Sequence, residues 1–395
     1  MDGYLVIQHS RKINTPRCVC NCVTSSASPS NENGTRIFKN TTEKAMTQST
    51  WKNIFGSTTG KIAIPSKTTP KAVIDITTLP SEQGNVTLKS VRRRAADSNR
   101  EVPLSLSSNS VVNPHNYEFI IANPYICKRS DIVLVTLFFT TYDETVFRGT
   151  MRKISSSGTS VVLGRKVVGI FLLGSSGNAT VDAMVEKESK EYGDIVQESY
   201  LDTHGNRTLK MIMGFRWVST YCAHAQYVMK VESHVIVNYD SLMRRLEQAP
   251  MSVFAEGTVL CCERPVSEDN TTKWYTSPVP SPKTYPPYLE GSAYVMSSDV
   301  SRGVFSMSPF VRYLSFDDVY VGIVMKTLGV IPVQGQGYDS PSWRSWNENE
   351  VTYLCRLGRS HTLKIRRSRN NPRYEQKQFL KLHQRLSLSN LTDRC

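Results

Sequence analysis

Asp131-Ile-Val-Leu-Val-Thr-Leu-Phe-Phe139 is the first of two apolar runs that decide the fold class, and Val167-Val-Gly-Ile-Phe-Leu-Leu-Gly174 is the second. Each run is short, continuous and bounded by polar residues, which is typical of a strand buried on both faces of a sheet. A polar segment, 143–165, separates them and is expected to include a helix. A third strand is predicted at 226–230 and runs into residues 231–238.

Two further helices are predicted between these strands. Residues 183–192 are charged and helical in character. Residues 208–221 place a row of apolar side chains on one helical face, namely Leu209, Ile212, Met213, Trp217 and Tyr221. Strands that alternate with helices predict a three-layer α/β domain with a mainly parallel sheet.

The end of the third predicted strand is the first place to look for chemistry, because ligands of such sheets bind beyond the carboxyl ends of the strands. The sequence there is Lys230-Val-Glu-Ser-His-Val-Ile-Val-Asn238. In an extended chain, side chains two positions apart point the same way, so Glu232 and His234 are predicted to face one ion. The alternative is a solvated strand end that binds nothing.

Composition divides the chain into three regions. Residues 1–115 are rich in Ser, Thr, Asn and Pro and show little periodicity, which indicates a mostly disordered stem or linker. Residues 116–355 carry the predicted strands and helices. Residues 356–395 form a basic C-terminal tail.

The tail accounts for most of the net charge of +14, because it holds eleven Lys or Arg and only two Asp or Glu. The rest of the chain is therefore mildly basic, which argues against a uniformly basic nucleic-acid domain. The tail is interpreted as a solvated or divergent terminal helix, with binding to an anionic glycan, membrane or nucleic acid as the alternative. Its only aromatic residues are Tyr374 and Phe379, so base stacking is poorly supported.

Cysteines and glycosylation sequons bear on the compartment. The nine cysteines lack zinc-ribbon spacing, which leaves scattered core thiols or disulfide partners. Seven Asn-x-Ser/Thr sequons, including those at Asn178, Asn206 and Asn270, point to the secretory lumen. No signal peptide or run of about twenty apolar residues is visible, so the sequence itself shows no membrane anchor.

A series of short motifs follows in order between Gly169 and Pro332. They are Phe171-Leu-Leu-Gly174, Glu188-x-x-x-Tyr192-Gly-Asp194, Asn206-Arg-Thr-Leu-Lys210, Lys273-Trp-Tyr275, Tyr285-Pro-Pro-Tyr288 and Phe316-Asp-Asp-Val-Tyr-Val-Gly322. They resemble the FLLG, E…YGD, NLTLK, KWY, YPPY and LEDVYVG motifs of the beta-1,3-galactosyltransferase family, which includes beta-1,3-N-acetylglucosaminyltransferases. The resemblance implies a GT-A fold, with a Rossmann-like sheet that binds a UDP-sugar.

The same resemblance implies an inverting hexosyltransferase that moves galactose or N-acetylglucosamine from UDP-Gal or UDP-GlcNAc to a glycan in beta-1,3 linkage. Asp318 matches the position of the base, and the chemistry needs a carboxylate beside the acceptor hydroxyl. Asp317, Tyr288 and Gly291 would lie on the acceptor side. Because adjacent residues of an extended segment point in opposite directions, at most one of the two aspartates is expected to face the acceptor.

Two motifs bear on the donor. Phe147-Arg148-x-Thr150 is similar to the family's IRxTW, which implies that Arg148 meets the phosphates of the nucleotide-sugar. The family's KxDDDxFVN pattern, whose acids contact Mn²⁺, aligns with residues 230–238 without a gap. Here Glu232, Ser233 and His234 replace the three acids.

The replacement leaves one negative charge of three, so weaker metal binding is expected. Glu232 and His234 are the candidate ligands of Mn²⁺, and Glu232 and Ser233 are candidate donor contacts. The altered motif also favours an alternative function, a catalytically degenerate relative that binds a glycan or a protein partner.

The resemblance extends to two cysteines and to the compartment. Cys127 and Cys222 stand at family-like positions, where either a disulfide or a pair of buried thiols fits. Family members imply the lumenal side of the Golgi membrane, and association with that membrane would need an anchor that this sequence does not show. Nucleic acid is not an expected partner.

Overall fold

The structure is a computed structural model, and it describes residues 111–128, 131–154, 158–263, 265 and 284–338, together with parts of 355–384. From 355 on, these parts are residues 355, 358, 360–364, 376, 377, 379–381 and 384. The predicted stem up to residue 110, most of the basic tail and the sequon at Asn270 lie outside the described residues.

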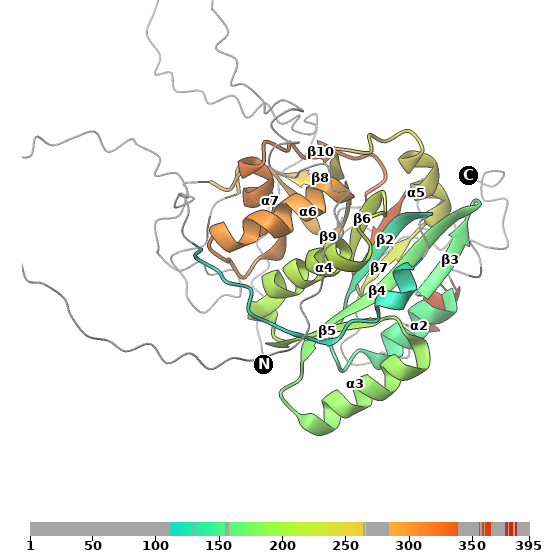
Figure 1. Cartoon of the computed structure of the whole chain (residues 1–395). Coiled ribbons are helices and arrows are strands. Elements are labelled where there is room, and N and C mark those ends of the chain that lie inside the picture. The colour runs from blue at the N-terminus through green and yellow to red at the C-terminus, as the bar shows by residue number, and fades with distance from the viewer. Residues whose placement is uncertain are drawn as a thin grey trace, which may run out of the picture. The chain divides into compact units, whose positions relative to one another are not determined.

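The described part is built on one large mixed sheet (Figure 1). Its strands lie in the order β1 (Phe119–Ile121), β5 (Ile195–Leu201), β4 (Arg165–Ser175), β2 (Ile132–Phe139), β6 (Tyr227–Glu232), β9 (Tyr288–Ser297), β8 (Ala255–Leu260) and β10 (Val333–Gln334). A further strand, β3 (Gly158–Val162), pairs antiparallel with β4.

The centre of the sheet is parallel, as predicted. Strands β5, β4, β2 and β6 are parallel neighbours, and all eight residues of β2 are buried. The chain moves outward from β2 to β4 and β5, then returns to the other side of β2 for β6. The strand order therefore reverses between β2 and β6, which makes their carboxyl ends the switch point. Beyond β6 the sheet is antiparallel through β9 and β8.

Six α-helices connect the strands of the described part: α2 (Thr145–Ile154), α3 (Ala179–Tyr192), α4 (Arg207–Tyr221), α5 (Tyr239–Leu246), α6 (Ser298–Met307) and α7 (Asp317–Thr327). Short 3-10 turns are η1 (Pro124–Cys127), η2 (His204–Asn206) and η3 (Ser308–Phe310). The helices predicted within 143–165, 183–192 and 208–221 are thus confirmed. α3 begins earlier than predicted because Asn178 caps it, accepting from the backbone N–H groups of Thr180 and Val181.

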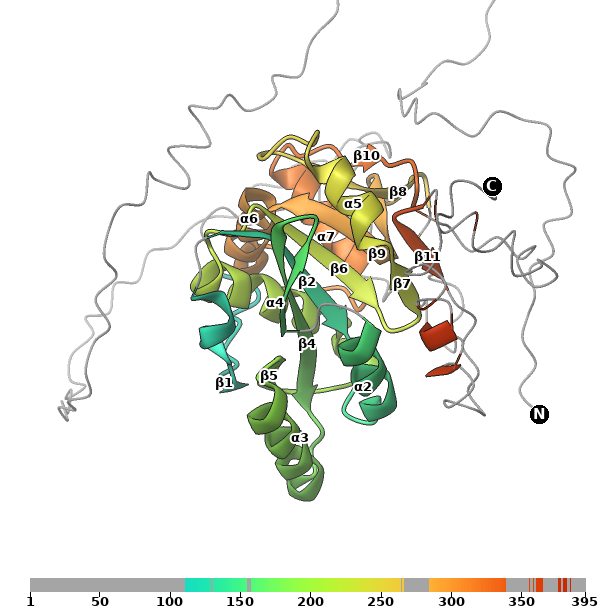
Figure 2. The same ribbon diagram turned by 90° about the vertical axis from the view of Figure 1, so that its right-hand side faces the viewer.

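Helices cover both faces of the sheet, which confirms the three layers (Figure 2). On one face, α4 lies so close that a Cβ on Gly214 would be 2.7 Å from Leu172 and 3.0 Å from Leu137. On the other, the Tyr239 hydroxyl of α5 lies 3.2 Å from the hydroxyl of Thr136. Because residues 136 and 137 are successive in β2, their side chains point to opposite faces.

The domain extends beyond both predicted boundaries. At its start, the backbone N–H groups of Val112 and Asn113 donate to the carbonyl of Pro309, so residues before 116 belong to it. At its end, β11 (Thr362–Lys364) pairs antiparallel with β7 (Val235–Val237), and Leu363 is fully buried. The boundary predicted at 355 is therefore too early, because the first part of the supposed tail is a strand of the fold.

Covalent and surface features of the described residues complete the fold. A disulfide joins Cys127 of η1 to Cys222, which caps the C-terminus of α4. Asn178 is exposed, whereas the side-chain amide of Asn206 donates to the carbonyl of Leu201 at 2.8 Å. Among the described residues, no helix has the length and apolar character needed to cross a membrane.

Candidate active site

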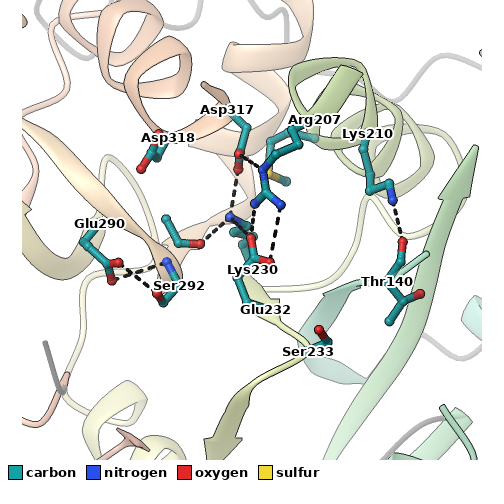
Figure 3. Close-up of polar contacts among 12 residues, drawn as sticks. Thr140, Arg207, Lys210, Lys230, Glu232, Ser233, Glu290, Ser292, Asp317 and Asp318 are labelled. Carbon is teal, nitrogen blue, oxygen red and sulfur yellow. Dashed lines mark hydrogen bonds and ion pairs between the residues drawn. The ribbon is translucent and has the colours of Figure 1, made fainter. Parts of the chain in front are cut away.

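Charged side chains gather at the switch point, where β2 and β6 end (Figure 3). Lys230 and Glu232 lie at the end of β6, Arg207 begins α4, and Asp317 and Asp318 begin α7. Lys210 of α4 makes a separate contact near the end of β2. Its ammonium contacts the carbonyl of Thr140 and lies 2.8 Å from Asp202. This is the region in which an α/β sheet binds its ligand.

Lys230 is the buried centre of the cluster. Its ammonium lies 2.7 Å from Glu232 and 2.8 Å from Asp317, donates to the carbonyl of Gly291, and sits 4.4 Å from the ring centroid of Phe139. Burial alone would lower the pKa of Lys230, but Asp317 and Glu232 outweigh it, so the pKa is raised. Lys230 is therefore a fixed cation that joins two carboxylates.

Arg207 bridges the same two carboxylates from the other side. Its Nε donates to Asp317 at 3.0 Å, Nη1 lies 3.5 Å from Glu232, and Nη2 forms a close ion pair with Glu232. Burial opposes the charge, yet Asp317 and Glu232 raise the pKa of Arg207 further above its ordinary value. The Arg207 side chain is 28% exposed, whereas those of Lys230 and Asp317 are 0% and 4% exposed.

Glu232 is committed to these two cations. Burial would raise its pKa, but Lys230 and Arg207 hold the pKa well below its usual range. The prediction that Glu232 and His234 point the same way from an extended strand is wrong, because β6 ends at Glu232 and residues 233–234 form a turn. Ser233 is buried in this turn, and its hydroxyl donates to Glu144 at 2.9 Å.

The residues at this position do not fit a manganese ion. Among the described residues, no group of three or more His, Cys, Asp or Glu side chains is arranged to hold a metal. The one carboxylate of the altered motif, Glu232, already accepts from Arg207 and contacts Lys230. A divalent ion would have to displace two cations from it, which the local charge opposes.

Asp318 lies in the first turn of α7, next to Gly291. The backbone N–H of Val319 donates to it at 2.8 Å, and a Cβ on Gly291 would lie only 2.8 Å from its Oδ2. Burial, and then the charge of Asp317, raises the pKa of Asp318 to about 6, against the smaller opposing effects of Lys230 and the Val319 N–H. A carboxylate with such a pKa is suited to general-base chemistry near neutral pH.

The two aspartates diverge for a different reason than predicted. They lie in a helix rather than an extended segment, so successive side chains are rotated by about 100°. Asp317 turns toward Arg207 and Lys230 (Figure 3). Asp318 packs beside Gly291. Asp317 therefore belongs to the ion cluster rather than to an exposed acceptor surface.

Arg148 is not available for the donor role predicted for it. The side chain is fully buried, and its guanidinium donates to Glu188 at 2.8 and 2.7 Å and to the carbonyls of Thr141 and Tyr142. These bonds hold the chain that follows β2. Arg148 is thus a positioning residue for the rim of the site, and direct contact with phosphates is contradicted.

The remaining predicted residues line the side of the cluster toward β9. Tyr288 is buried against Gly322, where any Cβ would lie 2.3 Å from the Cβ of Tyr288, and burial raises its pKa. Glu290 accepts from the hydroxyl of Ser292 at 2.8 Å and from Lys364 at 2.8 Å. The C-terminal strand β11 therefore reaches the neighbourhood of the site.

A cavity of about 360 Å³ lies beside the start of α4. Its lining includes Asn206 and Thr208, the two residues that flank Arg207 in sequence. Its walls come from the start of the domain, from the turn before α4 and from the loop before α7. They are formed by Asn113, Pro114, Tyr117, Gly205, Asn206, Thr208, Leu209, Tyr313, Leu314 and Ser315. A cavity with polar and aromatic walls beside charged groups is a usual setting for a ligand.

A match to a family model identifies the class of protein to which the chain belongs. The model of the galactosyltransferase family matches residues 145–336, which include the whole ion cluster and Asp318. The chain is therefore a glycosyltransferase, and its mixed, centrally parallel sheet is the GT-A type of α/β fold that the sequence motifs implied.

Two relatives show which family of glycosyltransferases the chain belongs to. The chain is 36% identical to beta-1,3-galactosyltransferase 1 of Mus musculus and of Homo sapiens over 257 residues, which is 64% of this chain and 76% of each relative. It is 34% identical to beta-1,3-galactosyltransferase 2 of Mus musculus over 227 residues, 56% of this chain and 53% of that protein. The chain belongs to the beta-1,3-galactosyltransferase family.

Among solved structures, the apo structure of the WbbM bifunctional glycosyltransferase matches with a TM-score of 0.34 and 8% identity, over 65% of this chain and 52% of that one. This likeness is too low to bear on the site.

The sequence interpretation gave no role to Lys230 and missed Arg207 altogether. The partners of Arg207 stand 25 and 110 positions away, so no local pattern reveals the bridge. One signal was available, because Arg207 occupies the position of the first leucine in the NLTLK motif. A cation gained there accompanies the negative charges lost at Ser233 and His234.

Proposed function

We propose that this chain transfers galactose or N-acetylglucosamine from UDP-Gal or UDP-GlcNAc to a hydroxyl of a glycan, in beta-1,3 linkage and with inversion. The observation that carries the proposal is the position of Asp318. It is a partly buried carboxylate, held beside Gly291 next to the ion cluster that contains the cations Lys230 and Arg207, and its pKa is raised to about 6. A base and a cation in one place are what transfer from a nucleotide-sugar requires.

The acceptor oxygen forms a bond to the anomeric carbon while the bond from that carbon to the diphosphate oxygen breaks, and the electron pair leaves with UDP. The proton of the acceptor hydroxyl passes to Asp318. Lys230 and Gly291 keep the first turn of α7 against β9, so that Asp318 faces the acceptor.

We propose the Golgi lumen as the place of action, on a glycoprotein or glycolipid acceptor. The membership of the chain in its family supports this, and so does the disulfide between Cys127 and Cys222, which is typical of oxidising compartments. The exposed sequon at Asn178 offers a glycosylation site that a lumenal protein would use, and mass spectrometry of the secreted chain tests its occupancy.

The test of the transfer is release of UDP by the full-length chain from UDP-Gal and UDP-GlcNAc over a panel of glycan acceptors. Asp318→Asn is expected to lower kcat about 100-fold or more, since it removes the base. Asp299→Asn is the matched control, because Asp299 lies in the first turn of the neighbouring helix α6 and accepts from the Val253 N–H. That variant should keep its activity.

Unchanged turnover in Asp318→Asn would contradict the role of this residue. The alternative, a degenerate relative that binds a glycan or a protein partner, is favoured by the commitment of Glu232 to internal ion pairs. It predicts no turnover with any donor and glycan binding that Asp318→Asn leaves intact.

A further inference from the structure

We propose that Arg207 takes the place of a divalent cation in this protein, so that the donor diphosphate is bound by hydrogen bonds from a resident guanidinium and no metal is needed. The inference rests on the proposed function, because it assumes that a nucleoside diphosphate enters this site. It starts from the misfit between the ion cluster and a manganese ion.

The position of Arg207 is the first argument. Its guanidinium lies 5.4 Å from the ring centroid of Phe139, the last residue of β2, and bonds to Glu232, the last residue of β6. It therefore occupies the switch point between these two strands, where such a sheet takes its ligand. In the family pattern, the acids that contact the metal align with this end of β6.

Accessibility is the second argument. Of the two cations that contact Glu232, Lys230 is fully buried, and it also contacts Asp317 and the carbonyl of Gly291. Arg207 is the partner with 28% of its side chain exposed. A diphosphate that enters from solvent therefore meets the guanidinium and not the ammonium.

The donors of Arg207 are the third argument. A guanidinium has five N–H groups, and among the described residues its hydrogen bonds are one to Asp317 and two to Glu232. Two N–H groups are left for an incoming anion. One lies on each terminal nitrogen, so each can donate a charge-assisted hydrogen bond to a phosphate oxygen, and such bonds are strong.

The carboxylates explain why the arginine stays in place without a ligand. Asp317 and Glu232 raise its pKa and fix its orientation, so the cation is present before the donor arrives. A site of this kind keeps its charge in the presence of a chelator. Ser233 and His234 are compatible with such a site, because it does not need the acids that would hold a metal.

Calorimetric titration of the full-length chain with UDP tests the proposal, once with EDTA and once with MnCl₂. The wild-type affinity should be the same in both buffers. Arg207→Leu, which restores the family residue, should weaken UDP binding about 10- to 100-fold in both, as expected for lost charge-assisted hydrogen bonds. Arg207→Lys keeps the charge but not the planar set of N–H donors. Its UDP affinity should therefore lie between those of the wild type and of Arg207→Leu.

Arg216→Leu is the matched control. Arg216 lies on the same helix, is also 28% exposed and pairs with the buried Glu198 at 2.7 Å, but it lies at the other end of α4. Its loss costs stability in the same way and should change UDP affinity less than about twofold. Thermal melts of all variants separate folding from binding, and Arg207→Lys decides the question if Arg207→Leu does not fold.

Three results would overturn the proposal: UDP binding that needs Mn²⁺, an affinity of the Arg207 variants within about twofold of the wild type, or no UDP binding at all. Transfer activity distinguishes this failure from that of the proposed function. Mn²⁺-dependent transfer would refute the arginine and keep the enzyme. Chelator-resistant UDP binding that depends on Arg207, without transfer to any acceptor, would keep the arginine and refute the proposed transfer.

Discussion

At the scale of single residues, burial and neighbouring charges act in opposite directions on the pKa values of the site. Lys230 and Arg207 pair with Glu232 and Asp317, so Lys230, Arg207 and Glu232 keep their charge although burial disfavours it. Asp318 stands beside this cluster, and the Asp317 charge adds to the burial that raises its pKa. One carboxylate is thus set apart from its neighbours as the group that can exchange a proton near neutral pH.

The raised pKa predicts the pH dependence of transfer. A base works only when it is deprotonated, so kcat/KM should fall about tenfold per pH unit below the pKa of Asp318, about 6, and level off above it. A pH profile of kcat/KM from about pH 4.5 to 8 checks this. UDP-Gal affinity, measured over the same range, should show no inflection of that size, because Arg207 and Lys230 keep their charge throughout and the diphosphate of UDP-Gal, esterified at both ends, has no proton that titrates there. A profile that stays flat well below the pKa of Asp318 would contradict the assignment.

Gly291 is predicted to matter because of the space it leaves. A Cβ at this position would lie 2.8 Å from Oδ2 and 3.2 Å from Cβ of Asp318, so Gly291→Ala must displace the carboxylate. Since a displacement near 1 Å can cost about 100-fold in rate, kcat should fall at least about 10-fold. Gly149→Ala is the control, because nothing lies within 4 Å of its added Cβ in α2. Steady-state kinetics and thermal melts of both variants test this, and a wild-type kcat in the Gly291→Ala variant would refute it.

At the scale of elements, the sequence predicted the strands at the centre of the sheet and missed elements outside it, among them the ten-residue β9 and the eleven-residue α7. The two apolar runs identified β2 and β4, because a strand buried on both faces needs little context. β3 was not predicted, because its residues alternate in burial and form no continuous apolar run. It joins β4 through a turn at Leu163 and Gly164, both with positive φ. Asp317 and Asp318 are predicted in an extended segment because the helix that they begin has no apolar periodicity at its start.

The site was predicted in the same uneven way. Asp318 and Glu232 were found because motifs carry them, whereas the partners that determine their chemistry come from other elements. Arg207 joins α4 to β6 and α7, and Arg148 turns inward toward Glu188 of α3. Only the folded structure shows whether an arginine meets a ligand or a buried carboxylate.

Helix α4 links the site to the disulfide, since Arg207 begins it and Cys222 caps its end. The bond closes a loop with a sequence separation of 95, so replacing Cys127 and Cys222 together by Ala should lower the free energy of unfolding by about 2–5 kcal/mol. Because the bond lies at the far end of α4, KM and kcat of the folded fraction should change little. Denaturant titration and kinetics at low temperature test both parts, and a loss below about 0.5 kcal/mol would contradict the first.

At the scale of the whole molecule, the chain returns to its site from both ends. Asn113 and His115 from the start of the domain contact the loop before α7 and the buried Glu198 of β5. Near the other end, β11 closes on β7, and Lys364 reaches Glu290 beside the site. The sequence composition predicts a separate basic tail, but part of this tail is a strand that pairs with the rest of the fold.

This arrangement predicts that the tail cannot be removed without loss of the fold. Leu363 is 0% exposed on β11, opposite Ile236, so Leu363→Ala should cost about 2–5 kcal/mol, and deletion of 356–395 should cost more because it also removes Phe379, which is 3% exposed. Leu201→Ala is the matched control, since Leu201 is 52% exposed and the same change there should cost less than about 0.5 kcal/mol. Denaturant unfolding of the three proteins measures the difference. If the deleted chain unfolds like the wild type and merely loses salt-dependent binding to polyanions, the tail is a binding appendage and its strand has no structural role.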